Sequence, residues 1–298
     1  MSNLYEQLTK LLSTEVDIPV SDDVLHLVKE LSNEKAIEAI LFYGSGLWKQ
    51  AEADTIYDFY ILVNRFKDFD DRKYLSVLGT VLPPNVYYME INNPQATLRC
   101  KYAVMRTDQF VAATSGKTIT PQIWARFAQP CRIVYARDES KKSQIINALA
   151  QAAITFHRKT FPLLPEGADK QVIWTTGLKE TYGAELRSEK EDRTHLIYEA
   201  NQEHFDKRSE YIVPMLAHET IDTLSLFRRK STRAVQKTIT FFRLMKAVLT
   251  FENSVEYALW KIERQSGIKM EASNFQKRYP LIGAWPLVWK LWRKGAFR

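Results

Sequence analysis

The sequence predicts an α+β protein, with a sheet in its first half and helices in its second half. Short apolar, β-prone runs separated by turn residues recur between residues 36 and 135. From about residue 143 the apolar residues take on helical spacing instead. We therefore expect a sheet domain over residues 1–140, a helical domain over 141–230, and a basic amphipathic helical tail over 231–298.

The composition is that of a globular protein. The chain has 298 residues, of which 45% are hydrophobic and 26% are charged, values ordinary for a folded protein. No run of about twenty apolar residues predicts a membrane-spanning helix, and the N-terminus has no signal-peptide pattern. Cys100 and Cys131 each lie in an apolar run, so we expect reduced core cysteines in a cytoplasmic protein.

Two helices and two strands are expected at the start of the chain. The helices are predicted over 4–13 and 22–32, where apolar residues recur at helical spacing. In the second helix the expected buried side consists of Val24, Leu25, Leu27, Val28 and Leu31. The strands are predicted over 36–43 and 58–63. The second of them ends in the continuous apolar run Ile61-Leu62-Val63, which is typical of the centre of a sheet.

The elements that follow complete the sheet and begin the helical part. In order, they are a helix over 68–82, a strand hairpin over 85–92 and 96–105, a helix over 121–127, a strand over 130–135, and helices over 143–160 and 171–201. Side chains alternate along a strand, so Arg99 and Lys101 are expected on one face of the hairpin. A basic sheet face of this kind suits a polyphosphate.

A glycine-rich turn ends the first predicted strand at Tyr43-Gly44-Ser45-Gly46, and the second strand begins at Asp58. Glycine lets the backbone come close to a ligand, and amides at the start of a helix favour an anion. A carboxylate on the next strand can hold a divalent metal against that anion. This arrangement is the skeleton of the polymerase-β-type nucleotidyltransferases, in which Mg²⁺ neutralises charge on a nucleoside triphosphate.

The skeleton assigns a role to each of its residues. Tyr43-Gly44-Ser45-Gly46 would bind the triphosphate, and Asp58 would be the metal ligand. Lys101 would also bind the nucleotide, because a lysine on an inward strand face is costly to bury without an anionic partner. Asp58, Ser45 and Lys101 are therefore the predicted catalytic residues. The alternatives are an ordinary structural turn and a lysine on an exposed sheet face.

The acidic part of the skeleton is incomplete. The usual site has two acids separated by one residue, whereas Asp58 is followed two positions later by Tyr60. Asp54 precedes the strand and is expected to be a solvated loop acid. Glu90, on a later strand, is expected to be a surface residue. With a single acid, a nucleotide-binding scaffold without catalytic activity stays open as a different class of function.

Six blocks of the sequence, taken in order, point to a narrower family. They are Phe42-Tyr43-Gly44-Ser45-Gly46 with Asp58-Phe59, Val86-Tyr87-Tyr88, Lys101-Tyr102-Ala103-Val104, Gln129-Pro130-Cys131-Arg132-Ile133-Val134, Glu185-Leu186-Arg187 with Lys190 and Arg193, and Arg233-Ala234-Val235-Gln236-Lys237. Over roughly residues 40–265 the chain resembles the mitochondrial translocator assembly and maintenance family of phosphatidate cytidylyltransferases, as a bacterial relative without a presequence.

The resemblance implies a specific reaction. Enzymes of this family join CTP to phosphatidic acid with Mg²⁺ and form CDP-diacylglycerol and pyrophosphate. On this basis Glu185, Arg187, Lys190 and Arg193 are expected on the substrate side of the site.

The tail carries the positive charge of the chain. Residues 228–298 hold sixteen Lys and Arg against four acids, a balance of +12, which leaves −5 for residues 1–227 because the whole chain carries +7. The end of the tail combines tryptophan with basic residues at helical spacing: Trp285, Trp289, Lys290, Trp292, Arg293 and Lys294. This composition is typical of a helix in a membrane interface, where each basic residue contributes about 1 kcal/mol at an anionic surface. The alternative is a helix that packs its aromatic residues on the body.

The sequence as a whole favours a CTP:phosphatidate cytidylyltransferase-like enzyme that uses Mg²⁺. We expect it to be peripheral on the inner face of the membrane, with an anionic membrane surface rather than nucleic acid as the partner of its tail. Two alternatives stay open. One is a nucleotidyltransferase acting on RNA or on a small phosphorylated alcohol, and the other is the degenerate, non-catalytic scaffold.

Overall fold

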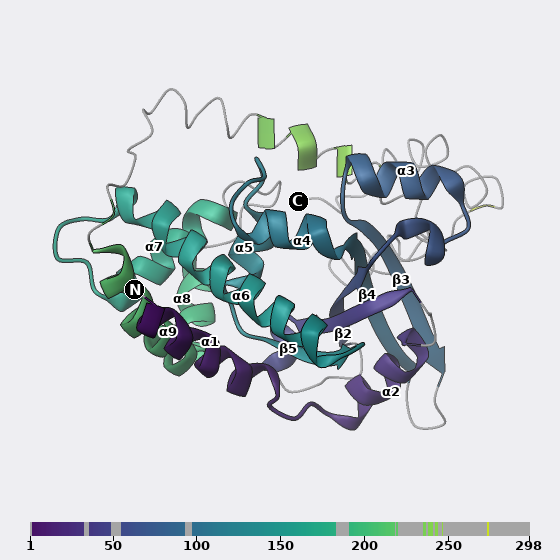
Figure 1. Cartoon of the computed structure of the whole chain (residues 1–298), viewed down its shortest axis with the longest axis horizontal. Coiled ribbons are helices and arrows are strands. Elements are labelled where there is room, and N and C mark those ends of the chain that lie inside the picture. Colours follow the sequence, from purple (N-terminus) through teal and green to yellow (C-terminus); the bar gives the residue numbers. More distant parts are fainter. Residues whose placement is uncertain are drawn as a thin grey trace.

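A five-stranded mixed sheet with helices on both faces forms the centre of the protein (Figure 1). The computed structural model describes residues 2–32, 36–48, 55–92, 97–182, 191–217, 219, 235–236, 238–240, 242–243, 246 and 273. The strands are β1 (Ile37–Tyr43), β2 (Ile56–Val63), β3 (Asn85–Asn92), β4 (Thr97–Arg106) and β5 (Cys131–Ala136). The chain is therefore α+β, as predicted.

Helices precede, interrupt and follow the sheet. They are α1 (Ser2–Val16), α2 (Asp22–Leu31), α3 (Lys73–Val81), α4 (Thr107–Thr114), α5 (Gln122–Phe127), α6 (Glu139–Thr160), α7 (Lys170–Tyr182), α8 (Glu191–Ala200) and α9 (Gln202–Leu216). Three short 3-10 turns are η1 (Ser45–Leu47), η2 (Phe66–Asp68) and η3 (Phe161–Leu163). None of the helices in the described residues is long and apolar enough to cross a membrane.

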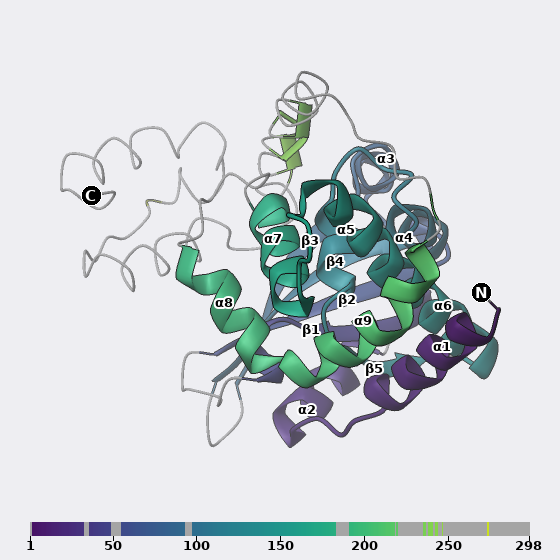
Figure 2. The same ribbon diagram turned by 90° about the vertical axis from the view of Figure 1, so that its left-hand side faces the viewer.

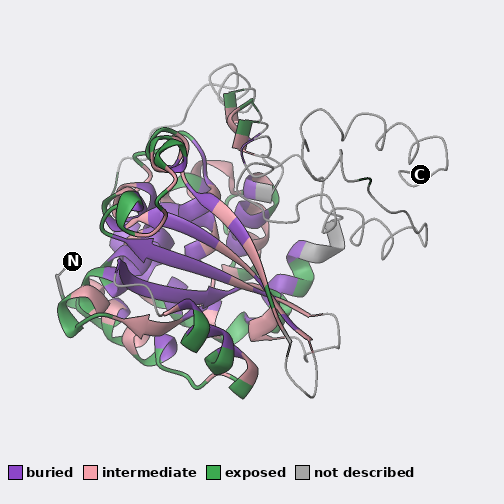
Figure 3. Ribbon diagram, turned by 90° about the vertical axis from the view of Figure 1, so that its right-hand side faces the viewer, coloured by how far each residue is buried: buried purple, intermediate pink, exposed green. Residues whose placement is uncertain are grey.

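The strand order β3-β4-β2-β1-β5 places β2 in the middle of the sheet. β2 pairs in parallel with β4 and antiparallel with β1, so the sheet is mixed. A parallel pair requires a crossover connection, which η2, α3 and β3 supply here. Ile61, Leu62 and Val63 of β2 are each 0% exposed, which confirms the predicted central strand, and Figure 3 shows the central strands buried along most of their length.

The two faces of the sheet belong to two hydrophobic clusters. Leu41, Tyr60 and Met105 point to one face, called here the α6 face, where the cluster also includes residues of α1 and α4 to α9. Ile40 and Phe59 point to the opposite face, which α2 and α3 cover. Figures 1 and 2 show the helices of the second half together with α1 on the α6 face. The alternation of strand side chains produces this division.

A buried ion pair connects α1 with α9. Arg208 of α9 is 2% exposed, and its guanidinium binds the Glu15 carboxylate of α1 and the backbone carbonyl of Ala128. The Nδ1 atom of His204 lies 3.0 Å from the other Glu15 oxygen. Burial alone would raise the pKa of Glu15, but Arg208 and His204 hold that pKa at about 2. The pair fixes α1 and α9 against the end of α5.

A second buried polar group joins α6, α7 and α9. The Ser209 hydroxyl lies 3.0 Å from Nε2 of His157 and accepts a hydrogen bond of 2.9 Å from the Trp174 indole. The remaining ring nitrogen of His157 lies 2.9 Å from the Ala153 carbonyl. Ser209 and His157 are both 0% exposed, and their hydrogen bonds join three helices, so we assign the pair a structural role.

The structure corrects several sequence predictions. Leu25, predicted to be buried, is 51% exposed, because only Val24, Leu27, Val28 and Leu31 of α2 face the sheet. The helix predicted over 68–82 is shorter in the structure, where α3 begins at Lys73 because residues 69–72 are not helical. The helix α4 was not predicted, and α9 was not predicted as a separate helix, although it lies in the predicted helical domain over 141–230. In α9 the periodic pattern is hidden because Arg208 and Ser209 occupy core positions and Pro214 lies inside the helix.

Other predictions agree with the structure or concern residues that the structure does not describe. Both cysteines are free and buried, and burial raises the pKa of each thiol to about 12. The predicted helix over 171–201 corresponds to α7 and α8, with residues 183–190 outside the described part of the chain. The division into domains at 140 and 230 stays a prediction.

We predict that the buried His157 makes the protein less stable in acid. Burial lowers the pKa of His157 from 6.5 to about 4, so the unfolded chain takes up this proton first as the pH falls. The free energy of unfolding should therefore fall between pH 6.5 and pH 4, by roughly 3 kcal/mol from this group. Urea unfolding across this range measures the effect. A His157→Gln variant should show a flatter dependence, and an unchanged slope in that variant would contradict the assignment.

Candidate active site

Asp58 and Lys101 meet where β2 and β4 run in parallel. The register places Asp58 opposite Lys101, and the lysine Nζ lies 3.3 Å from Oδ1 of the aspartate. Both side chains lie on the α6 face, because each is two residues before a core residue of that face. The Lys101 side chain is 38% exposed and that of Asp58 is 28% exposed, so a solute can reach the pair.

The glycine turn lies directly against this pair. Tyr43, the last residue of β1, is opposite Asp58 in the antiparallel register. Gly44 follows with φ 87° and ψ −162°, a conformation that residues with a side chain rarely adopt. A Cβ atom at Gly44 would lie 3.3 Å from Oδ2 of Asp58. Glycine therefore allows the backbone of the turn to approach the carboxylate.

The residues after the turn form the three-residue turn η1, which begins at Ser45. The sequence predicts a short helix that begins at Leu47-Trp48-Lys49-Gln50, and residues 49–54 lie outside the described part of the chain. A turn of this length has no extended helix dipole. Ser45 is exposed and Gly46 is partly exposed, so the turn presents backbone amides and a hydroxyl near Asp58. An anion would be bound here by hydrogen bonds rather than by a helix terminus.

An aromatic cluster and a guanidinium form one wall beside the turn. The rings of Tyr43, Tyr60 and Phe127 contact one another with centroids 5.1 to 5.7 Å apart. Arg126, at the end of α5, lies over the Tyr43 ring at 5.2 Å. Position 126 was expected to lie in a helix, but no role was predicted for its arginine. Nothing local in the sequence distinguishes it from a surface arginine.

Tyr60 stands where a second acid would complete the usual motif. It is 2% exposed and belongs to the aromatic cluster. Glu90 does not replace that acid, because it is on the edge strand β3 and forms an ion pair of 3.2 Å with Arg99. Asp54 lies outside the described residues. Within the part of the chain that the structure describes, no group of three or more acids, histidines and cysteines gathers as a metal site.

The remaining predicted residues are not brought to the site by the described structure. Glu185, Arg187 and Lys190 lie outside the described residues, and Arg193 is in α8 with an undescribed side chain. Trp285, Trp289 and Trp292 of the tail also lie outside the described residues. The predicted substrate side of the site therefore stays a prediction. Arg99 and Lys101 do share one sheet face, as predicted.

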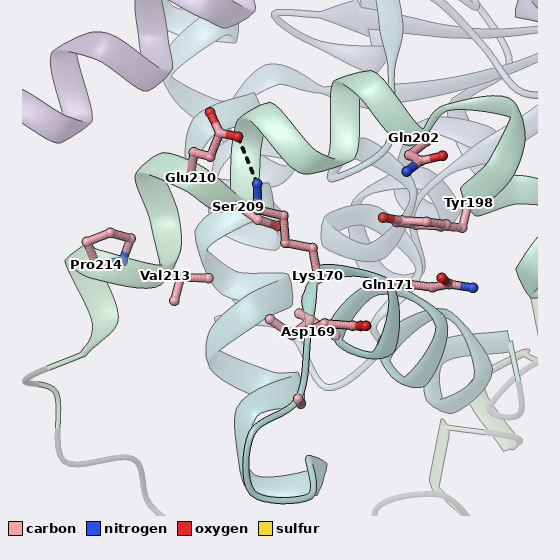
Figure 4. A pocket seen from close by; sticks show the side chains of 11 residues that line it. Asp169, Lys170, Gln171, Tyr198, Gln202, Ser209, Glu210, Val213 and Pro214 are labelled. Carbon is pink, nitrogen blue, oxygen red and sulfur yellow. Dashed lines mark hydrogen bonds and ion pairs between the residues drawn. The ribbon is translucent and has the colours of Figure 1, made fainter.

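A hollow of about 620 Å³ lies elsewhere, between α7 and α9 (Figure 4). Its lining includes Asp169, Lys170, Tyr198, Gln202 and Glu210, and it contains none of the predicted site residues. Lys170 and Glu210 form an ion pair of 2.7 Å across it. Lys170 and Glu210 thus satisfy each other, and Asp169 accepts a hydrogen bond from the Val172 amide, so we do not assign a ligand to this hollow.

Comparisons with known proteins leave the family open. No family model matches the chain, and no curated protein matches it. Among solved structures, it is similar to a nucleotidyltransferase-like protein from Exiguobacterium sibiricum 255-15, with 10% sequence identity and a TM-score of 0.28 over 78% of this chain and 90% of that one. A likeness at this level establishes neither a shared family nor a shared activity, so function has to be inferred from the residues of the site.

We predict a measurable energetic coupling between Gly44 and Asp58. Gly44→Ala introduces backbone strain of about 1–3 kcal/mol and a close contact with the carboxylate. Gly167→Ala is the matched control, since Gly167 also has a positive φ of 73° but a Cβ there meets nothing within 4 Å. Gly44→Ala should therefore cost more stability than Gly167→Ala in urea unfolding.

Part of the excess should disappear when the carboxylate is removed. In a double-mutant cycle, Asp58→Ala should offset the additional cost of Gly44→Ala by about 1 kcal/mol. It should have no such effect on Gly167→Ala. The assignment would be contradicted if the two glycine variants lost the same stability. It would also be contradicted if the effects of Gly44→Ala and Asp58→Ala were additive, since a Cβ at position 44 would then not contact the Asp58 carboxylate.

Proposed function

We propose that the protein is a nucleotidyltransferase that transfers a cytidylyl group from CTP to phosphatidic acid at a membrane surface, forming CDP-diacylglycerol and pyrophosphate. The proposal that the protein transfers a nucleotidyl group rests on one observation. A glycine turn with exposed polar groups lies against a reachable aspartate–lysine pair on one sheet face. The lipid acceptor is supported by the composition of the tail and by the resemblance of the sequence blocks.

The proposed reaction needs little acid–base chemistry from the protein. An acceptor phosphate oxygen, already ionised at neutral pH, attacks the α-phosphorus of CTP. The new phosphorus–oxygen bond forms as the bond to pyrophosphate breaks, and pyrophosphate leaves with the electron pair. Catalysis then depends on positioning and on charge stabilisation. The Gly44 amide and the Ser45 hydroxyl would bind the outer phosphates, and the Lys101 ammonium would neutralise charge beside them.

Asp58 fits the part of a magnesium ligand. Mg²⁺ in nucleotide sites is held by one or two carboxylates together with phosphate oxygens, so a single aspartate with a bound triphosphate is a sufficient donor set. Lys101 contacts Oδ1 of Asp58, whereas Oδ2 faces the Gly44 turn. When bound, Mg²⁺ supplies neutralisation of the phosphate charge. Asp58 would be the residue of this chain that holds the ion.

The proposed acceptor lies in an anionic membrane. The +12 balance of residues 228–298 favours an anionic partner, and the clustered tryptophans favour a membrane interface over nucleic acid. We therefore place the protein at the inner face of the membrane, in the cytoplasm. In this arrangement the tail would hold the enzyme on the same surface that contains its acceptor.

A second candidate function follows from Tyr60. With an aromatic residue in place of the second acid and Glu90 paired to Arg99, the site offers one carboxylate for a metal. This favours a non-catalytic nucleotide-binding scaffold as the alternative.

The decisive experiment is a nucleotide panel with detection of pyrophosphate. With Mg²⁺ and phosphatidic-acid liposomes, CTP should give more pyrophosphate than ATP, GTP or UTP. Asp58→Asn and Lys101→Met should each lower kcat by about 10²-fold or more, because each removes charge stabilisation at the phosphates. Glu90→Gln is the matched control, since it alters an ion pair on the same sheet face without touching Asp58.

Two other results of this experiment would each support a different alternative. Pyrophosphate release with soluble phospho-alcohols or RNA but not with phosphatidic acid would overturn the lipid acceptor. No turnover with any acceptor, together with nucleotide binding that Asp58→Ala leaves unchanged, would favour the scaffold.

A further inference from the structure

The beginning of the tail crosses the sheet domain near the candidate site. The Gln236 side-chain amide donates to the Ile119 carbonyl at 2.8 Å. Further along, the Lys246 ammonium donates to the carbonyls of Leu82 and Pro84, the latter at 2.7 Å. These contacts span from the loop before α5 to the turn before β3. Figures 1 and 2 show the described pieces of this segment next to α3.

Arg243, between these two contacts, is a partly buried cation with neutral partners. Its Nη1 atom donates to Oγ1 of Thr120 at 3.0 Å and to Oε1 of Gln122 at 2.6 Å. Its Nε atom is buried without a hydrogen-bond partner. No carboxylate pairs with Arg243 in the part of the chain that the structure describes. A guanidinium that is shielded from water is stabilised by a neighbouring anion. None of the described residues supplies that anion to Arg243.

Arg126 and Lys246 add positive charge near Arg243. Burial lowers the pKa of the Arg243 guanidinium, and the positive charge of Arg126 lowers it further. Burial likewise lowers the pKa of Lys246 to about 7, with a further contribution from Arg243. Gln122, which accepts a hydrogen bond from Arg243, and Arg126 are four residues apart in α5 and lie on one side of that helix. Arg126 and Arg243 are therefore neighbours whose positive charges repel. An anion bound among them would remove that repulsion.

Arg126 and Arg243 lie on the side of the sheet that carries the candidate site. Tyr60, whose hydroxyl is near enough to affect the pKa of Arg243, is two residues after Asp58 on the same sheet face. Arg126 lies over Tyr43, which is opposite Asp58 in the β1–β2 register. Arg126 and Arg243 thus approach, from α5 and from the tail, the face that carries Asp58 and Lys101.

We propose that Arg243 and Arg126 form a phosphate-binding subsite beside Asp58, so that the tail contributes a ligand-binding residue to the site. Guanidinium groups bind phosphate through paired, charge-assisted hydrogen bonds, and the unpartnered Nε of Arg243 is a donor of this kind. The bound group is a phosphate of the nucleotide or of the acceptor. That choice rests on the proposed function, whereas the existence of the subsite does not.

The subsite is tested with inorganic pyrophosphate, which requires neither CTP nor lipid. Calorimetric titration of the full-length protein should show that Arg243→Gln and Arg126→Gln each weaken pyrophosphate binding by about 10-fold to 100-fold. Gln236→Ala is the control for tail docking, because it removes the contact with Ile119 and keeps every charge. Urea unfolding of each variant shows whether it is folded.

Titrations with CTP and with soluble dihexanoyl phosphatidic acid identify the source of the phosphate. A loss confined to CTP assigns the subsite to the triphosphate, and a loss confined to the short-chain lipid assigns it to the acceptor. Arg243→Lys, which keeps the charge without the paired donors, should recover part of the affinity. Affinities for all three ligands within twofold of wild type in both Gln variants, or an equal loss in Gln236→Ala, would overturn the proposal. Lost pyrophosphate binding in a protein that turns over no acceptor would support the subsite and reject the proposed reaction.

Discussion

The parallel register between β2 and β4 is the constraint on which the candidate site depends. A shift of one residue would turn one strand's side chains to the opposite face and separate Asp58 from Lys101. The register is held further along the same strands, where Ile61 is opposite Val104 and both are 0% exposed. Because moving these residues would expose apolar surface, the hydrophobic core fixes the position of two polar groups at its edge.

The elements that the sequence predicted correctly have local signals. The strands alternate or are continuously apolar between turn residues, and the Gly44 turn and Asp58 are recognisable from residue types and spacing alone. α9 has no such signal, because Arg208 is buried only by virtue of Glu15, which lies 193 positions away in the sequence. An arginine in a helix ordinarily indicates a solvent-facing position. Local patterns therefore fail where a distant partner decides what is buried.

The same limit applies to the site. The motif predicted its acid and its turn, and the alternation along β4 predicted the side of Lys101. Arg126 and Arg243 could not be predicted, because each reaches the α6 face through tertiary contacts of its own element. Arg126 is placed by the contact of α5 with Tyr43, and Arg243 by hydrogen bonds to Thr120 and Gln122. In the sequence both look like ordinary basic residues.

The charge of the site explains how a single acid could be sufficient for the proposed reaction. Two phosphate-bearing substrates repel each other, so the site must supply positive charge where they meet. Sites with two or three acids obtain that charge from metal ions held by the acids. Here Tyr60 occupies the second acidic position, and the proposed phosphate subsite of Arg126 and Arg243 is beside it. The positive charge at that position would then come from the protein itself, and the tail, which is proposed to bind the membrane, would also complete the site.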